Sequence, residues 1–152
     1  MSDPVVVLLV EDEPLVRIVL SELLTESGFR VLEAANAQEA LTILGAELDV
    51  QVMLTDVDMP PGLNGYELAR LVHERWPEVG ILVTSGRQWP TNGDLPQGAA
   101  FLAKPMPNEV LVSYVKAAME RSTGAAEDTA VEVERTVVPF PRRAKTLWPS
   151  SE

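Results

Sequence analysis

The sequence predicts an α/β protein built on a doubly wound, five-stranded parallel sheet. Short β-branched runs without alternation, such as residues 5–10, are typical of strands buried on both faces. Amphipathic stretches with helical spacing alternate with these runs, which favours a parallel sheet covered on both faces by right-handed crossovers. The simplest strand order for five such strands is 2-1-3-4-5. The 152 residues suit one compact domain with a tail.

The first strand and helix are predicted from residues 5–28. The helix is expected to begin at Pro14, because proline suits the first helical turn, and to end before Gly28. Its apolar residues lie on two adjacent stripes at helical spacing: Leu15, Val19 and Leu23, beside Val16, Leu20 and Leu24. This spacing is typical of an amphipathic helix.

Two capping signals predict the next two helices. A second strand over residues 29–33 precedes Asn36 and Glu39, which have the spacing of a capping box, and Gly45 closes that helix. A third strand over residues 50–55 precedes the same spacing at Asn64 and Glu67. The apolar stripe of this third helix consists of Leu68, Leu71 and Val72, and Trp76-Pro77 ends it.

The last strands are predicted over residues 79–83 and 99–103. A final helix begins near Pro107 and carries apolar residues at helical spacing: Val110, Leu111, Tyr114, Val115 and Ala118. The connection between the strands, residues 86–98, contains two prolines and three glycines, which leave no room for an ordinary helix. We therefore expect the fourth helix to be short, mobile or absent, with Trp89 a candidate for partner contact.

Composition excludes several classes of function. The net charge of −11 opposes nucleic-acid binding, which depends on Lys and Arg, and the absence of Cys excludes thiolate chemistry and Cys-ligated metals. No basic leader and no span of about 20 apolar residues is present, so we expect a cytoplasmic protein without membrane contact. Residues 1–121 form the predicted domain. Residues 122–152 are first acidic and then basic. We expect them to form a mostly disordered tail that is too short for a further output domain.

Residues with charged or hydroxyl side chains directly follow several of the predicted strands. The carboxyl ends of parallel strands line the ligand-binding edge of such a sheet, so these residues are expected to lie near one another. They are Glu11, Asp12 and Glu13 after the first strand, Asp56 and Asp58 after the third, Thr84 and Ser85 after the fourth, and Lys104 after the fifth. Carboxylates this close need a cation, and oxygen ligands without His or Cys favour Mg²⁺.

Four motifs at these strand ends resemble the receiver domain of two-component response regulators. They are Leu-Val-Glu-Asp-Glu-Pro (9–14), Leu-Thr-Asp-Val-Asp-Met-Pro (54–60), Val-Thr-Ser-Gly (83–86) and Phe-Leu-Ala-Lys-Pro (101–105). The resemblance covers about residues 4–121 and implies a flavodoxin-like fold. It also implies a cytoplasmic phosphoprotein that receives its phosphoryl group from a histidine kinase or phosphotransfer protein, and that turns over no other substrate.

The resemblance also implies a role for each site residue. Asp56 would be the phosphoacceptor, Asp12 a direct Mg²⁺ ligand, Glu11 a ligand through water, and the Asp58 backbone carbonyl a further ligand. Lys104 would pair with Asp56 and then with a phosphoryl oxygen, and Lys104-Pro105 resembles the cis peptide of the family. Thr84 and Phe101 would switch together on phosphorylation.

We expect a stand-alone receiver, which would signal through a partner protein or serve as a phosphate sink. We also expect a monomer, because the usual dimer face includes the fourth helix. Two other classes of protein are alternatives. A phosphohydrolase of the haloacid dehalogenase type would use Asp56 and Asp58 as its Asp-x-Asp pair, but that pair follows the first strand in such enzymes. A dinucleotide- or flavin-binding module would need a glycine-rich turn after the first strand, where acidic residues stand instead.

Overall fold

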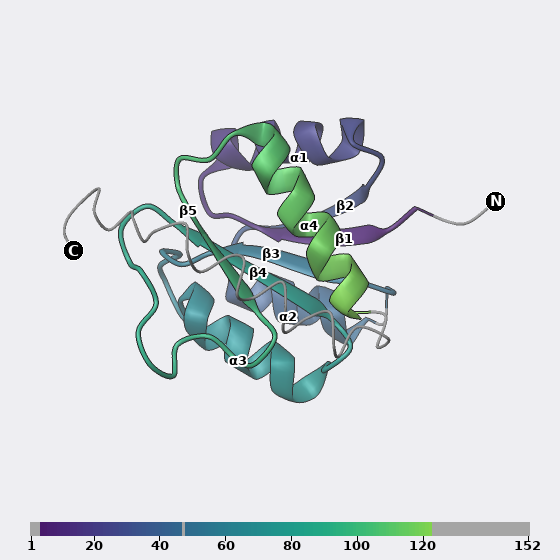
Figure 1. Ribbon diagram of the computed structural model, residues 1–152. Coiled ribbons are helices and arrows are strands. Elements are labelled where there is room, and N and C mark those ends of the chain that lie inside the picture. The colour runs from purple at the N-terminus through teal and green to yellow at the C-terminus, as the bar shows by residue number, and fades with distance from the viewer. Residues whose placement is uncertain (1–3, 47, 123–152) are drawn as a thin grey trace.

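Five parallel strands form one sheet in the order β2-β1-β3-β4-β5, which confirms the predicted fold class (Figure 1). The computed structural model describes residues 4–46 and 48–122. The strands are β1 (Val6–Val10), β2 (Arg30–Ala34), β3 (Val52–Asp56), β4 (Gly80–Ser85) and β5 (Ala100–Ala103). The helices are α1 (Pro14–Glu26), α2 (Ala37–Gly45), α3 (Gly65–Arg75) and α4 (Asn108–Ser122).

The helices cover the two faces of the sheet in pairs, α1 and α4 on one face and α2 and α3 on the other (Figure 1). Successive residues of a strand point to opposite faces. Leu8 and Met53 therefore pack toward α2 and α3, whereas Leu9 and Leu54 pack toward α1 and α4. Strands β1, β3, β4 and β5 are buried along most of their length, which explains their continuous apolar sequences. The edge strand β2 differs, because Arg30 and Glu33 are exposed.

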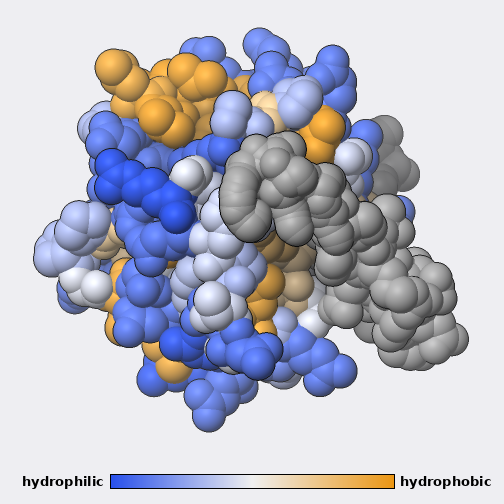
Figure 2. All heavy atoms as spheres, turned by 60° about the vertical axis from the view of Figure 1, so that its left-hand side comes forward, coloured by the Kyte–Doolittle hydropathy of each residue, from blue (hydrophilic) through white to orange (hydrophobic). Residues whose placement is uncertain are grey.

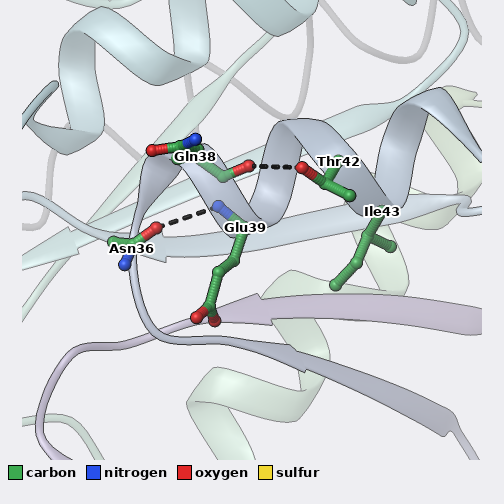
Figure 3. A pocket seen from close by; sticks show the side chains of 5 residues that line it. All are labelled: Asn36, Gln38, Glu39, Thr42 and Ile43. Carbon is green, nitrogen blue, oxygen red and sulfur yellow. Dashed lines mark hydrogen bonds between the residues drawn. The ribbon is translucent and has the colours of Figure 1, made fainter.

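Only one of the two predicted capping boxes is complete. Asn64 Oδ1 accepts the Glu67 N–H at 2.9 Å, and Glu67 Oε1 accepts the Asn64 N–H at 2.9 Å. At the start of α2, Asn36 Oδ1 accepts the Glu39 N–H (Figure 3), but the Glu39 carboxylate accepts the N–H of Ala35, one residue earlier than a capping box requires. Both glutamates still satisfy a backbone donor at a helix start.

No helix lies between β4 and β5, as the proline and glycine content predicted. Side chains of α3 hold this connection in place: the Tyr66 hydroxyl donates to the Gln88 carbonyl, and Arg70 Nη1 donates to the carbonyls of Gly93 and Asp94 at 3.2 and 3.0 Å. Leu95 packs on the core beneath it. The mobility of this segment stays a prediction.

Helix α1 is buried far less than its two apolar stripes suggest. Leu24 is its one buried residue, whereas Leu15 is 76% exposed and Val19 62% exposed. A helix that lies on a sheet buries the side that faces it, and here that side is the one around Leu24. Both stripes meet the core only toward the end of the helix, where Leu20 and Leu23 pack beside Leu24. The apolar residues of the first turns therefore form an outer surface.

Helix α4 is the last element that the structure describes, and it ends at Ser122. The predicted tail beyond it lies outside the described residues. Within the described part of the chain, none of the helices has the length and hydrophobicity needed to span a bilayer.

Candidate functional site

Three carboxylates meet at the carboxyl edge of the sheet. Glu11 directly follows β1, and Asp56 is the last residue of β3, the strand that pairs with β1. Glu11, Asp12 and Asp56 each offer a carboxylate oxygen within 4.8 Å of the other two. We call these three residues the acidic cluster. Glu13, the next acid along the chain, is exposed and lies outside it.

Lys104 supplies a positive charge to the acidic cluster. Its Nζ lies 3.2 Å from Asp56 Oδ1 and 3.7 Å from Glu11 Oε1. The lysine follows β5, and its N–H donates to the Ser85 carbonyl at 3.0 Å, which joins the ends of β4 and β5. The Lys104–Pro105 peptide bond is cis, as the motif predicted. One ammonium group thus partly offsets three neighbouring carboxylates.

Burial makes the charges of this cluster costly. It raises the pKa of the Asp56 carboxyl, although Lys104 opposes the shift, and it raises the pKa of Glu11, although the Glu13 N–H and Lys104 oppose it. The Glu13 N–H donates to Glu11 Oε2 at 3.1 Å. Oxygen ligands that are crowded and desolvated are well suited to a hard divalent cation, so this donor set fits Mg²⁺.

Thr84 and Phe101 lie on the strands beside the cluster. Thr84 is buried and is the register partner of Asp56, and its carbonyl accepts the Val57 N–H at 3.1 Å. Phe101 is buried on β5, and its ring centroid lies 5.4 Å from that of Trp89 at an interplanar angle of 49°. The segment that replaces a fourth helix therefore touches the buried aromatic residue of β5.

Asp58 stands apart from the three clustered carboxylates. Its Oδ1 accepts a hydrogen bond from Gln88 Nε2, and the Gln88 N–H is itself held by Ser85 Oγ at 2.9 Å. Arg17 binds the cluster's backbone instead, with Nη1 donating to the Glu11 carbonyl at 2.6 Å. No local sequence signal pointed to Gln88 or Arg17, because their partners come from other elements or turns.

The loop after Asp56 is tightly built against the start of α3. The Pro60–Pro61 peptide bond is cis, a feature that no motif in the sequence predicted. The Gly65 N–H donates to the Val57 carbonyl at 2.9 Å, and a Cβ at Gly65 would lie 2.2 Å from the Asp56 carbonyl oxygen. Only glycine allows this close approach of the helix to the strand end.

A separate hollow lies over the first turns of α2 (Figure 3). Its lining contains no member of the acidic cluster and consists of Asn36, Gln38, Glu39, Thr42 and Ile43. Several of these side chains are engaged in local helix contacts, such as the Thr42 hydroxyl donating to the Gln38 carbonyl at 3.1 Å. This hollow is therefore distinct from the acidic cluster.

Comparison with known families agrees with this geometry. Residues 7–116 match the response regulator receiver domain, so the chain belongs to that family. Members of the family are signalling modules that receive a phosphoryl group from histidine kinases, and the acidic cluster is typical of their Mg²⁺ site.

Several relatives extend the comparison. The chain is 31% identical over 157 residues to the transcriptional regulatory protein FixJ of Azorhizobium caulinodans, an alignment that covers 97% of this chain and 71% of FixJ. It is 38% identical over 110 residues to the two-component response regulator ORR5 of Oryza sativa, covering 68% of this chain and 81% of ORR5. It spans only 46% of the positive alginate biosynthesis regulatory protein of Pseudomonas aeruginosa, at 36% identity over 74% of this chain.

Solved structures share the fold. The receiver domain of the hybrid histidine kinase CckA superposes with a TM-score of 0.64 at 32% identity, over 75% of this chain and 98% of that domain. The response regulator TrrA of Thermotoga maritima, whose structure is a complex with Mg²⁺ and BeF, superposes with a TM-score of 0.65 at 24% identity over 75% of this chain and 98% of TrrA.

Proposed function

We propose that this chain is a phosphorylation-controlled receiver in which Asp56 accepts the phosphoryl group. The observation that carries the proposal is the position of Asp56 at the end of β3, with Lys104 at 3.2 Å and two further carboxylates within 4.8 Å. A carboxylate is a competent nucleophile toward phosphorus, and the transferred group needs its negative oxygens neutralised. Asp56 provides the nucleophile and Lys104 one positive charge, and the acidic cluster would hold the Mg²⁺ that supplies the other.

The proposed roles of the individual residues are those that the family resemblance implies. In the transfer, Asp56 Oδ bonds to phosphorus as the phosphorus–nitrogen bond of a phosphohistidine donor breaks, which leaves an acyl phosphate on Asp56. Lys104 Nζ moves from the Asp56 carboxylate to a phosphoryl oxygen, and the Thr84 hydroxyl donates to another. Asp12 and Asp56 would hold Mg²⁺ directly, Glu11 through water, and Asp58 through its backbone carbonyl. When bound, Mg²⁺ supplies charge neutralisation for the phosphoryl oxygens.

The output is proposed to be a conformational switch that a partner protein reads. New contacts of the phosphoryl group with Thr84 and Lys104 favour one conformation of the loops around β4 and β5. Phe101 then takes part through its contact with Trp89, which belongs to the segment between those strands. Use as a phosphate sink is the second candidate, favoured by the lack of a helix in that segment, where family members carry a readout surface.

The test is the intact mass of the protein after incubation with acetyl phosphate and Mg²⁺. Wild type is expected to gain one phosphoryl group, and the gain is expected to need Mg²⁺. Asp56→Asn should abolish it, whereas the matched variant Asp58→Asn should retain it, because the Asp58 carboxylate is bonded to Gln88 outside the cluster. A gain that survives in Asp56→Asn and disappears in Asp58→Asn would contradict the assignment.

A second measurement tests the site if acetyl phosphate is not a phosphoryl donor for this protein. Beryllofluoride with Mg²⁺ mimics the phosphoryl group on a carboxylate, and its addition should shift the amide resonances of Thr84 and Lys104. Absence of both the mass gain and these shifts would show that the site does not bind phosphoryl groups. Continuous turnover of a small phosphate ester through Asp56 would instead favour the haloacid dehalogenase alternative.

A further inference from the structure

The outward face of α1 is apolar along its first turns and acidic along its last. Leu15, Ile18 and Val19 are 76%, 50% and 62% exposed. Glu22 and Glu26 follow on the same side, since residues seven and eleven positions after Leu15 lie above it on a helix, and both are exposed. Figure 2 shows hydrophobic side chains gathered at the upper left of the molecule, at the height of α1 in Figure 1.

The basic residue of α1 does not neutralise this face. Arg17 Nη1 donates to the Glu11 carbonyl at 2.6 Å, and Arg17 Nε lies 3.4 Å from Glu33 Oε1, so the guanidinium faces the end of the sheet. Within residues 4–46 and 48–122, neither Glu22 nor Glu26 forms an ion pair. A ligand of this face therefore needs apolar groups followed by positive charges.

The chain itself carries such a segment beyond the described residues. Residues 137–145 read Val-Val-Pro-Phe-Pro-Arg-Arg-Ala-Lys, with apolar residues first, basic residues after them and no acid. This composition stands out in a chain with a net charge of −11, in which Asp and Glu outnumber Lys and Arg by 23 to 12. The order along the segment matches the order along α1, from apolar to charged.

The length of chain between α4 and this segment allows the two to meet. Helix α4 ends at Ser122 and lies on the same face of the sheet as α1 (Figure 1). Residues 123–136 can extend to about 45 Å at roughly 3.3 Å per residue. The 13 residues of α1 span only about 20 Å. The connecting chain is therefore more than twice as long as α1, which packs on the same face of the sheet as α4.

We propose that residues 137–145 dock on the α1 of their own chain. Val137 to Phe140 lie over Leu15, Ile18 and Val19, and Arg142 and Arg143 pair with Glu22 and Glu26. A second copy of α1 is a poorer occupant, since it would bring the same two glutamates to a face that already carries them. In this register the docked segment covers the apolar face of α1. The acidic cluster lies beyond the first turn of α1 and stays uncovered.

Two features of the sequence make the test sharp. The chain has three isoleucines, of which Ile18 lies on the proposed surface, and Ile43 and Ile81 belong to the core on the α2 and α3 side of the sheet. The chain has no cysteine, so Ala144→Cys places a single nitroxide label inside the proposed segment. Isoleucine methyl spectra of the full chain then report which isoleucine the label approaches.

The expected result is selective broadening of the Ile18 methyl resonance, with Ile43 and Ile81 retaining their intensity. Reversing two charges with Arg142→Glu and Arg143→Glu should restore the Ile18 intensity. The matched pair Arg75→Glu and Arg87→Glu makes the same change in net charge elsewhere and should leave the broadening in place.

Two outcomes would overturn the proposal. One is an Ile18 resonance that the label does not broaden, or that it broadens no more than Ile43. The other comes from mixing nitroxide-bearing, isotopically unlabelled chain with methyl-labelled chain that has no nitroxide. Equal broadening of Ile18 in that mixture would assign the contact to a second copy and not to the chain's own segment.

Discussion

Replacement of Gly65 by alanine is expected to damage both the fold and the proposed phosphoacceptor. A Cβ at Gly65 would lie 2.2 Å from the Asp56 carbonyl oxygen and 2.8 Å from both the Asp56 carbonyl carbon and the Val57 Cα. All three neighbours are backbone atoms, so no change of side-chain rotamer relieves the overlap. Either α3 must move away from the sheet, or the end of β3 must move and take Asp56 with it.

The size of the effect follows from two opposing contributions. Atoms without a bond between them approach to about 3.5 Å, so the overlap demands a shift of more than about 1 Å. Overpacking of a tight site costs about 1–3 kcal/mol, and backbone obstruction belongs at the upper end. Alanine in place of glycine gains at most about 1 kcal/mol in a helix. We expect a net loss of about 2 kcal/mol, or a fall in Tm of about 8 °C for a domain of this size.

The assay is urea unfolding followed by far-UV circular dichroism, with Gly45→Ala as the matched control. Gly45 ends α2, and nothing lies within 4 Å of a Cβ placed there, so the same substitution should leave stability unchanged or raise it by about 0.5 kcal/mol. Phosphoryl uptake from acetyl phosphate should fall in Gly65→Ala alone. A Gly65→Ala protein as stable as wild type, or a Gly45→Ala protein equally destabilised, would refute the reasoning.

Three further predictions address the site and its supports. Because burial raises the pKa of Asp56, the ionised carboxylate destabilises the fold. Asp56→Asn should therefore raise the free energy of unfolding at pH 7 in the absence of metal. This gain should vanish below about pH 4, where the carboxyl is protonated in the unfolded chain as well. Urea titrations at several pH values measure it, and an unchanged or negative difference at pH 7 would contradict the cause assigned to the shift. Tyr66→Phe removes the hydrogen bond to the Gln88 carbonyl, so it should cost about 1 kcal/mol and speed amide exchange in residues 86–95; strong protection throughout that segment in both proteins would show that it is not mobile. Asn64→Ala removes the capping box of α3 and should lower stability by about 1 kcal/mol in thermal unfolding, whereas a change below a few tenths would mean that water replaces the cap.

The sequence alone determined the class of fold and that acids following β1 and β3 meet at one edge of the sheet, whereas the structure showed that Glu13 and Asp58 lie outside the acidic cluster. Doubly buried parallel strands require continuous apolar runs, so β1 and β3 are visible in the sequence, and the residues that follow such runs must lie at the carboxyl edge of the sheet. Asp12, Asp56 and Lys104 were therefore predictable as neighbours although they are far apart in the chain. The missing helix between β4 and β5 was equally predictable, because proline and glycine act locally.

Only the tertiary structure decided which surfaces and side chains meet. The apolar stripes of α1 look alike in the sequence, and only packing against the sheet shows that Leu24 is buried while Leu15 is exposed. The hydrogen bond from Gln88 to Asp58 joins residues 30 positions apart, and no local pattern encodes it. Periodicity specifies which residues can share a face, but the choice between two faces and the partners across a loop depend on the three-dimensional arrangement of the whole domain.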